Sequence, residues 1–428
     1  MSPLLRKVAA MRLSLTLTTL LLLTPLTCQA QQQVAAPAPT WKVGTAVAKI
    51  TPQRRLHMSG YSSRKTPAEG TEQELFGKAI AIEDEQGQRV VFVTLDLIGV
   101  LAELRATVAK EVQQQFKLPP KQLLMNASHT HCGPAYGRED AKDYFDSLAK
   151  NLVKIVGQAI ERLEPARLTY SQARCSVAIN RRTPTEQGFV NHPNPHGPVD
   201  HTVPVLAAHD PAGKLKAVVF GYACHNTTMG FYRWLGDYAG FAQEYFQADH
   251  PGVTALFMMG CGGDQNPYPR SELKYAKMHG RSLATAVEAA LETNQQTLRH
   301  QRSVRGAIQA VMGRVDLEFS DPDRDDFAYP VQVIRLGDDL MLVALGNEVV
   351  VDYSLRLKRE LGKQDGPAIW VAGYSNVYDG YIPSRRVLLE GGYEARSRPW
   401  KPELEQRIIG QVHELVGQLK GQQAASGK

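Results

Sequence analysis

Residues 125–134 read Met125-Asn126-Ala127-Ser128-His129-Thr130-His131-Cys132-Gly133-Pro134. An apolar run, 123–125, stops here at polar residues and then Gly-Pro, which is typical of a strand that leads into a loop. Alternate residues of a strand share a face, so His129 and His131 can point into one cleft. Imidazole is the commonest metal ligand and the usual general base near neutral pH. The motif predicts a metal or proton-transfer site, although taken alone it also fits two loop histidines bonded to nearby carbonyls.

Four further apolar runs end in the same way. Runs 216–223, 253–259, 340–345 and 368–373 lead into polar or ionisable residues through glycine-containing turns, where glycine lets the backbone bend sharply. The residues that follow these runs are His225, Asp264, Glu348 and, after the last run, the tyrosines of 374–381. Five such ends in one chain predict a single site assembled at one edge of a sheet.

The spacing of apolar residues predicts the remaining elements. A strand is expected from 41 to 52, and hairpins around 85–87 and 210–213. Helical spacing is expected at 101–116, 144–163, 237–247, 271–292, 347–361 and 402–420. This alternation predicts an α/β fold: a mixed sheet with flanking helices and a metal site at strand-end loops. Segment 180–204, polar and rich in Pro, Gly and His, is predicted to be a functional loop.

The N-terminus has the composition of an export signal. Arg6, Lys7 and Arg12 precede the short apolar stretch 13–26, and Cys28-Gln29-Ala30 follows, which predicts a signal peptide over residues 1–30 and an exported mature chain, periplasmic or secreted. A flexible lead-in is expected over 31–40, one catalytic domain over 41–420 and a disordered tail over 421–428. Cleavage would lower the net charge from +6 to +3 by removing three basic residues, so no nucleic-acid partner is predicted.

Four cysteines remain in the mature chain, Cys132, Cys175, Cys224 and Cys261. No CxxC spacing appears, and buried thiols with at most one disulfide are expected. His129, His225 and Glu348 together form a His₂Glu set of the kind that catalytic zinc sites use. The alternatives are that His225 is a core histidine and that Glu348 is an acidic residue near a helix N-terminus.

The chain resembles the neutral/alkaline ceramidases, specifically their N-terminal catalytic domain, from about Trp41 to Tyr393. The resemblance rests on separated motifs that occur in the family's order: VGTAVAKITP (43–52), MSGY (58–61), VFVTLD (91–96), SHTHCGP (128–134), INR (179–181), GDQNP (263–267) and NVYDGYI (376–382). It implies a zinc-dependent hydrolase that cleaves the amide bond of N-acylated sphingoid bases by means of zinc-activated water.

The resemblance also implies residue roles. The zinc ligands would be His129, His225, Glu348 and Tyr381. The catalytic residues at the reaction centre would be His131, Arg181, Asp264, Asn266 and Tyr393, with Arg181 or a tyrosine hydroxyl stabilising the oxyanion and His131 carrying a proton to the leaving amine.

The sequence departs from the family at two points. Asn266 occupies the position of the family's Ser, and an amide can only form hydrogen bonds there. The family carries a C-terminal β-sandwich, and we expect no counterpart of it within this sequence after the last helix. We therefore expect a zinc amidohydrolase acting on a small-molecule or lipid N-acyl amine, ceramide or a related lipid first, with transient membrane-surface contact and no predicted oligomeric state. The alternatives are a metallophosphoesterase-like hydrolase and a non-catalytic metal-containing binding protein derived from the amidase.

Overall fold

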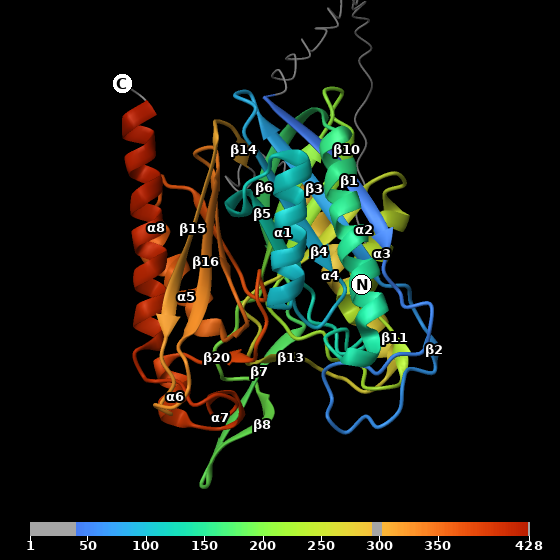
Figure 1. Ribbon diagram of the computed structural model, residues 1–428, viewed down its shortest axis with the longest axis vertical. Coiled ribbons are helices and arrows are strands. Elements are labelled where there is room, and N and C mark those ends of the chain that lie inside the picture. Colours follow the sequence, from blue (N-terminus) through green and yellow to red (C-terminus); the bar gives the residue numbers. More distant parts are fainter. Residues whose placement is uncertain (1–39, 293–301, 427–428) are drawn as a thin grey trace, which may run out of the picture. The chain divides into compact units, whose positions relative to one another are not determined.

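The computed structural model describes residues 40–292 and 302–426, which lie in one compact unit (Figure 1). The predicted signal peptide over 1–30 and the lead-in up to residue 39 lie outside the described residues. In the described part of the chain, no helix is both long enough and apolar enough to cross a membrane.

The larger sheet has nine strands in the order β12-β10-β9-β6-β1-β3-β4-β5, with β14 paired to β6. Most pairs are antiparallel, but β4–β5 and β10–β12 are parallel, so the sheet is mixed as predicted. Its strands are β1 (Trp41–Lys49), β3 (Phe76–Asp84), β4 (Arg89–Leu95), β5 (Leu123–Ala127), β6 (Glu164–Arg174), β9 (Thr202–His209), β10 (Leu215–Tyr222), β12 (Thr254–Met259) and β14 (Arg302–Val304).

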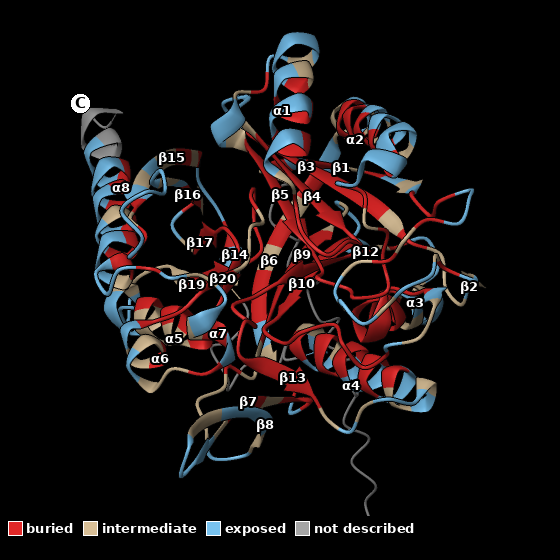
Figure 2. Ribbon diagram, turned by 60° about the horizontal axis from the view of Figure 1, so that its bottom comes forward, coloured by how far each residue is buried: buried red, intermediate tan, exposed pale blue. Residues whose placement is uncertain are grey.

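A second sheet of four strands has the order β15-β16-β17-β19. Its strands are β15 (Ile308–Leu317), β16 (Phe327–Leu336), β17 (Leu340–Leu345) and β19 (Ala368–Ala372). The two sheets share one apolar core, in which Phe92 and Leu168 of the larger sheet lie in the same cluster as Ile334 and Trp370 of the smaller one. Figure 2 shows most strands of the larger sheet as buried and the helices outside the sheets as partly buried and partly exposed.

Helices cover the outer face of each sheet. Helices α1 and α2 pack on the strands around β4, α3 and α4 pack on β9, β10 and β12, and α5 and α8 pack on the smaller sheet. The helices are α1 (Ala102–Phe116), α2 (Lys142–Glu161), α3 (Asp237–Asp249), α4 (Leu273–Glu292), α5 (Val351–Leu361), α6 (Arg385–Glu390), α7 (Tyr393–Arg396) and α8 (Leu404–Ser426), with 3₁₀ turns η1 (Pro120–Gln122) and η2 (Glu139–Ala141). The fold therefore has helix, sheet, sheet and helix layers.

Burial on both faces explains the continuous apolar runs in the sequence. In β4, Val91 and Val93 face the helices α1 and α2, whereas Val90 and Phe92 face the second sheet. A strand that is covered on both sides needs apolar residues at successive positions, not at alternate ones.

The predicted loop over 180–204 is wrong. Most of the segment forms an antiparallel hairpin of β7 (Ala178–Thr185) and β8 (Gly188–Asn194), and β13 (Gln265–Pro267) pairs with β7. Strand β8 has no buried residue, so the sequence lacks the alternation of apolar and polar residues by which strands are recognised.

Two smaller differences concern helix ends. The helix expected from 347 begins at Val351, because residues 348–349 form β18 (Glu348–Val349), which pairs with β20 (Tyr381–Ile382). Helix α8 continues to Ser426, into the segment predicted as a disordered tail. Among the described residues all four cysteines are buried and none forms a disulfide, which agrees with the expected buried thiols. A further short pair joins β2 (Gly70–Thr71) and β11 (Arg233–Trp234).

The ends of the two sheets meet at one edge. Isolated bridges join Asn126 near the end of β5 to Ser375 after β19, and Gly260 after β12 to Ala372 at the end of β19. The buried Asn126 amide also donates to the Met259 and Gly373 carbonyls at 3.2 and 2.8 Å. At this end of the molecule β7, β13 and β20 gather beside one another (Figure 1).

Gly44 tests the packing of α2 on the larger sheet. A Cβ at this position would lie 2.2 Å from the Ala159 carbonyl oxygen and 2.7 Å from the Arg162 carbonyl carbon, both main-chain atoms. We expect Gly44→Ala to lower the free energy of unfolding by about 1–3 kcal/mol, the usual effect of overpacking. Gly70→Ala is the control, because nothing lies within 4 Å of its Cβ. Equal denaturation midpoints for the two variants would contradict the α2–β1 packing described above.

Candidate active site

Two histidines from separate strand ends face each other with their rings fixed by main-chain oxygens. His129 follows β5 and its Nδ1 lies 2.7 Å from the Ile98 carbonyl, while His225 follows β10 and its Nδ1 lies 2.7 Å from the Gly262 carbonyl. A carbonyl only accepts, so each Nδ1 carries the proton. Each Nε2 therefore carries a lone pair, both Nε2 atoms lie 3.2 Å from the same oxygen of Glu348, and both histidines are completely buried.

A carboxylate and a phenol complete this group. Glu348 Oε2 lies 3.2 Å from Nε2 of both His129 and His225, and the Tyr381 hydroxyl lies 3.3 Å from Nε2 of His225. Tyr378 donates to the other oxygen of Glu348 at 3.1 Å, which fixes the carboxylate. Pairing of β18 with β20 places Glu348 and Tyr381 opposite each other.

This arrangement fits a cation. The ring nitrogens of His129, His131 and His225 lie within 4.8 Å of one another, and the group could hold a metal ion. Two imidazole lone pairs and a carboxylate oxygen converge, and acceptors at such distances repel unless a cation or proton lies between them. Burial, together with Arg181 and His129, lowers the pKa of His225 to about 3, so its ring is neutral as ligation requires.

His131 stands at the edge of the group. Its Nε2 lies 3.1 Å from Nε2 of His129, and its Nδ1 has no hydrogen-bond partner within the described residues. The ring lies against Tyr61, with ring centroids 4.7 Å apart. It also lies so close to Gly60 that a Cβ there would fall 2.3 Å from the His131 Cγ. Gly60, with φ +92°, is therefore required for the ring to occupy this position.

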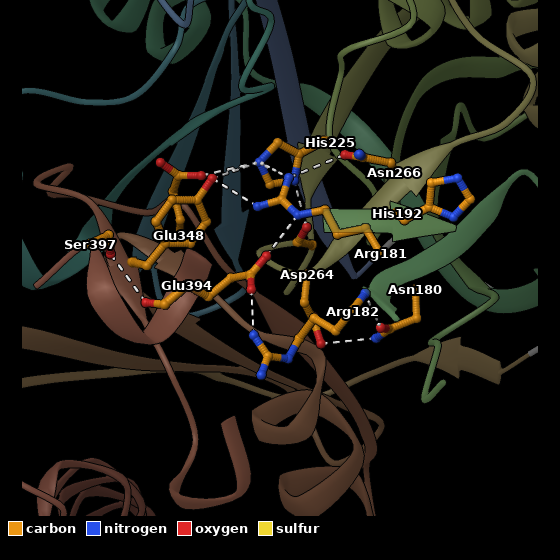
Figure 3. Close-up of polar contacts among 12 residues, drawn as sticks. Asn180, Arg181, Arg182, His192, His225, Asp264, Asn266, Glu348, Glu394 and Ser397 are labelled. Atoms are coloured by element: carbon orange, nitrogen blue, oxygen red, sulfur yellow. Dashed lines mark hydrogen bonds and ion pairs between the residues drawn. The ribbon is translucent and has the colours of Figure 1, made fainter. Parts of the chain in front are cut away.

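Arg181, on β7, lies next to these residues. Its guanidinium donates to the Tyr381 hydroxyl at 2.9 Å and to the Asn266 side-chain oxygen at 3.2 Å, and it lies 3.2 Å from Nε2 of His225 (Figure 3). Arg181 is 3% exposed, so its charge acts in a medium with little water screening.

The remaining predicted residues have different surroundings. Asp264 does not touch the histidines: its carboxylate accepts from the Asn180 amide at 3.0 Å and from the Val351 backbone at the start of α5 at 2.9 Å. Burial, with repulsion from Asp352, raises the pKa of Asp264 to about 7. Tyr393 packs edge-on against Tyr381 at 5.3 Å and is 55% exposed, so it lies where the site opens to solvent.

Sequence reasoning missed Glu394 and Tyr378. Glu394 pairs with Arg181 at 2.8 Å, and the signal for it was its position next to Tyr393. Tyr378 lies inside the motif NVYDGYI (376–382), but no pattern distinguishes it from Tyr381. In the structure, the backbone of these loops is strained, because His129, Asn347, Tyr374 and Asn376 all have positive φ. Such conformations gather at functional sites.

The fold and this geometry define an α/β protein with a candidate metal centre at the joined edge of two sheets. A family model described as neutral/alkaline non-lysosomal ceramidase, N-terminal, matches residues 41–267, more than half of the 428 residues. The chain therefore belongs to the neutral/alkaline non-lysosomal ceramidase family, as the sequence motifs indicated.

Individual relatives agree with this assignment. Neutral ceramidase A of Dictyostelium discoideum is 24% identical over 238 residues, 51% of this chain and 33% of that protein. Neutral ceramidase of Drosophila melanogaster is 27% identical over 258 residues, 53% of this chain and 36% of that protein. The matches thus span about a third of the relatives' own length.

Solved structures share the fold. The neutral ceramidase from Pseudomonas aeruginosa superimposes with a TM-score of 0.77 at 19% identity, covering 90% of this chain and 75% of that chain. A ceramidase solved as a complex with C2 gives a TM-score of 0.71 at 19% identity, covering 86% of this chain and 73% of that chain. At these identities the comparison establishes the architecture alone.

Metal content tests the centre. We expect the purified protein to carry close to one equivalent of metal and His225→Ala to carry little, because the substitution removes one of the converging lone pairs. His192→Ala is the matched control, since His192 is exposed on β8 and no metal role is assigned to it. The metal content is measured by elemental analysis after gel filtration. Equal metal content in the wild type and in His225→Ala would show that His225 is not a ligand.

Proposed function

We propose that this protein is a zinc-dependent amidohydrolase that cleaves an N-acyl amine, most favourably ceramide or a related N-acyl lipid. The observation that carries the proposal is the convergence of His129, His225, Glu348 and Tyr381 beside the buried Arg181, in a chain of the ceramidase family. Two imidazoles, a carboxylate and a phenol suit zinc, which prefers nitrogen and oxygen ligands in such sets.

The metal, when bound, would acidify a water molecule and polarise the substrate carbonyl. The protein's own groups would do the rest. Arg181 directs two nitrogens toward the centre and would stabilise negative charge on the carbonyl oxygen, because such donors act most strongly where water is excluded. The amide C–N bond then breaks, water supplies the hydroxyl of the new carboxylic acid, and the amine leaves with a proton.

His131 is proposed to carry that proton. Its Nδ1 has no partner within the described residues, and its Nε2 lies beside His129 at the centre, so the ring can accept a proton and release it to the amine. Tyr393 would contact the substrate where the site opens to solvent, since its ring is half exposed and packs edge-on against Tyr381.

Asp264 and Asn266 would act on other side chains. Asp264 orients Asn180 and holds the start of α5, and the Asp264 carbonyl accepts from the Arg181 backbone at 2.9 Å. Asn266 accepts from Arg181 and would help to hold it. Retention of Glu348, Tyr381 and Arg181 in one buried group favours an active enzyme over a binding protein, and membership of the ceramidase family favours amides over phosphoesters.

We further propose that the mature chain is exported, with the composition of residues 1–30 as support. A ceramide-like substrate resides in membranes, so the protein would contact a lipid surface transiently while it takes up the substrate.

The proposed activity is tested with the metal-analysed protein and a panel of N-acyl sphingoid bases, N-acyl ethanolamines and N-acyl amino acids. We expect release of free amine from at least one class, highest for the sphingoid bases, and loss of release after chelation. In Arg181→Lys the rate should fall by about 10²–10³, the usual effect of losing an oxyanion donor. Absence of amine release from every class by the metal-loaded protein would refute the proposal.

Asn266 gives a second test, because an amide cannot serve as a nucleophile. We expect no acyl-enzyme on any side chain and an Asn266→Ser variant that stays active. Loss of one hydrogen bond to Arg181 is worth about 1 kcal/mol, or about fivefold in rate. Rapid quenching followed by intact-protein mass spectrometry makes the comparison, and a trapped acyl adduct on the wild-type protein would overturn water as the nucleophile.

A further inference from the structure

Glu394 lies between two buried arginines. It belongs to α7 and is 1% exposed, and its two oxygens are divided between Arg181 and Arg182. Figure 3 shows the carboxylate between the two guanidinium groups. Burial raises the pKa of Glu394, but the charges of Arg181 and Arg182 outweigh it and keep the carboxyl ionised.

The Arg181 contacts divide the guanidinium into a rear and a front. Its Nε donates backward to Glu394 at 2.8 Å. Its two terminal nitrogens point forward, one toward His225 and Asn266 and the other toward the Tyr381 hydroxyl. Since a guanidinium is planar and rigid, fixing the Nε edge also fixes the direction of both terminal nitrogens.

Arg182, unlike Arg181, has other anionic and main-chain partners besides Glu394. Arg182 also donates to Glu390 at 3.0 Å and to the Gly391 carbonyl at 2.7 Å, so α6 and α7 stay attached to β7 through these contacts. Across residues 40–292 and 302–426, by contrast, Glu394 is the only carboxylate that forms an ion pair with Arg181. The two arginines therefore depend on this carboxylate unequally.

We propose that Glu394 is the positioning residue for Arg181: it holds the guanidinium so that its terminal nitrogens face the reaction centre, and it balances the buried charge. This inference rests on the amidohydrolase function proposed above. Without the carboxylate, the Arg181 charge would be drawn toward Glu348, the nearby acid of the metal group, and would no longer be directed at the substrate.

Glu394→Gln tests the role, with Glu390→Gln as the matched control. Glutamine keeps the size of the side chain but removes the charge and one acceptor. We expect kcat of Glu394→Gln to fall by about 10–100-fold, the range found when a partner that orients a site residue is removed. KM and metal content should stay within about twofold, and Glu394→Asp should recover part of the rate. Glu390→Gln should keep kcat within about twofold, because Glu390 contacts Arg182 and Arg386 but not Arg181.

A double-mutant cycle separates positioning from general stabilisation. If Glu394 acts through Arg181, then Glu394→Gln added to Arg181→Lys should lower kcat by no more than about twofold further. Full additivity of the two losses, an unchanged kcat in Glu394→Gln, or loss of metal in that variant would each overturn the proposal.

A binding measurement keeps this inference distinct from the proposed reaction. Hexanoate, a carboxylate of the kind that amide hydrolysis releases, is titrated calorimetrically into the metal-loaded proteins. We expect Glu394→Gln and Arg181→Lys to weaken binding to a similar extent and Glu390→Gln to leave it unchanged. If hexanoate binding weakens in both variants but the protein releases no amine, the positioning role is supported and the proposed reaction is rejected. If binding weakens in Arg181→Lys but not in Glu394→Gln, the positioning role is rejected.

Discussion

The candidate centre depends on the apolar contact between the two sheets. His129 and His225 follow strands of the nine-stranded sheet, whereas Glu348 and Tyr381 follow strands of the four-stranded sheet. No short-range feature of the chain brings these four side chains together; the β18–β20 pairing aligns Glu348 with Tyr381, and the core shared by the sheets joins this pair to the histidines. The layered packing therefore sets the distances between the candidate ligands, and a bound ion would in turn link the two sheets at their joined edge.

The elements that could be predicted are those whose environment leaves a trace in local sequence. Strands covered on both faces read as unbroken apolar runs, and all five runs used to locate the site are strands. The β7–β8 hairpin left no such trace, because β8 is exposed and its polar residues follow loop composition. The division into two sheets was likewise not predicted, since strand pairing between distant segments depends on the whole core and not on any one run.

The residues of the candidate site also differ in how far the sequence reveals them. His129, His225 and Glu348 could be proposed from the sequence because ligand-type residues after apolar runs are chemically distinctive, and the structure brings the three together. Glu394 could not be proposed, because one acid among the charged residues of 385–398 resembles a solvent-exposed helix residue until its burial is known. The start of α5 was misplaced for a related reason: Asn347 adopts positive φ at 64°, which the apolar spacing of the following helix does not reveal.

The main-chain partners of the two histidines have an evolutionary consequence. In many metal sites a carboxylate side chain orients the ligand histidine, so that a single substitution can remove it. Here the Ile98 and Gly262 carbonyls perform this task for His129 and His225. A carbonyl is present whatever the residue type, so the side chain at position 98 can change without altering the tautomer of His129. Position 262 is restricted, because a Cβ there would fall 2.8 Å from the main-chain nitrogen of Cys224, the residue before His225. The orientation of His129 is therefore less sensitive to substitution of its main-chain partner than the orientation of His225.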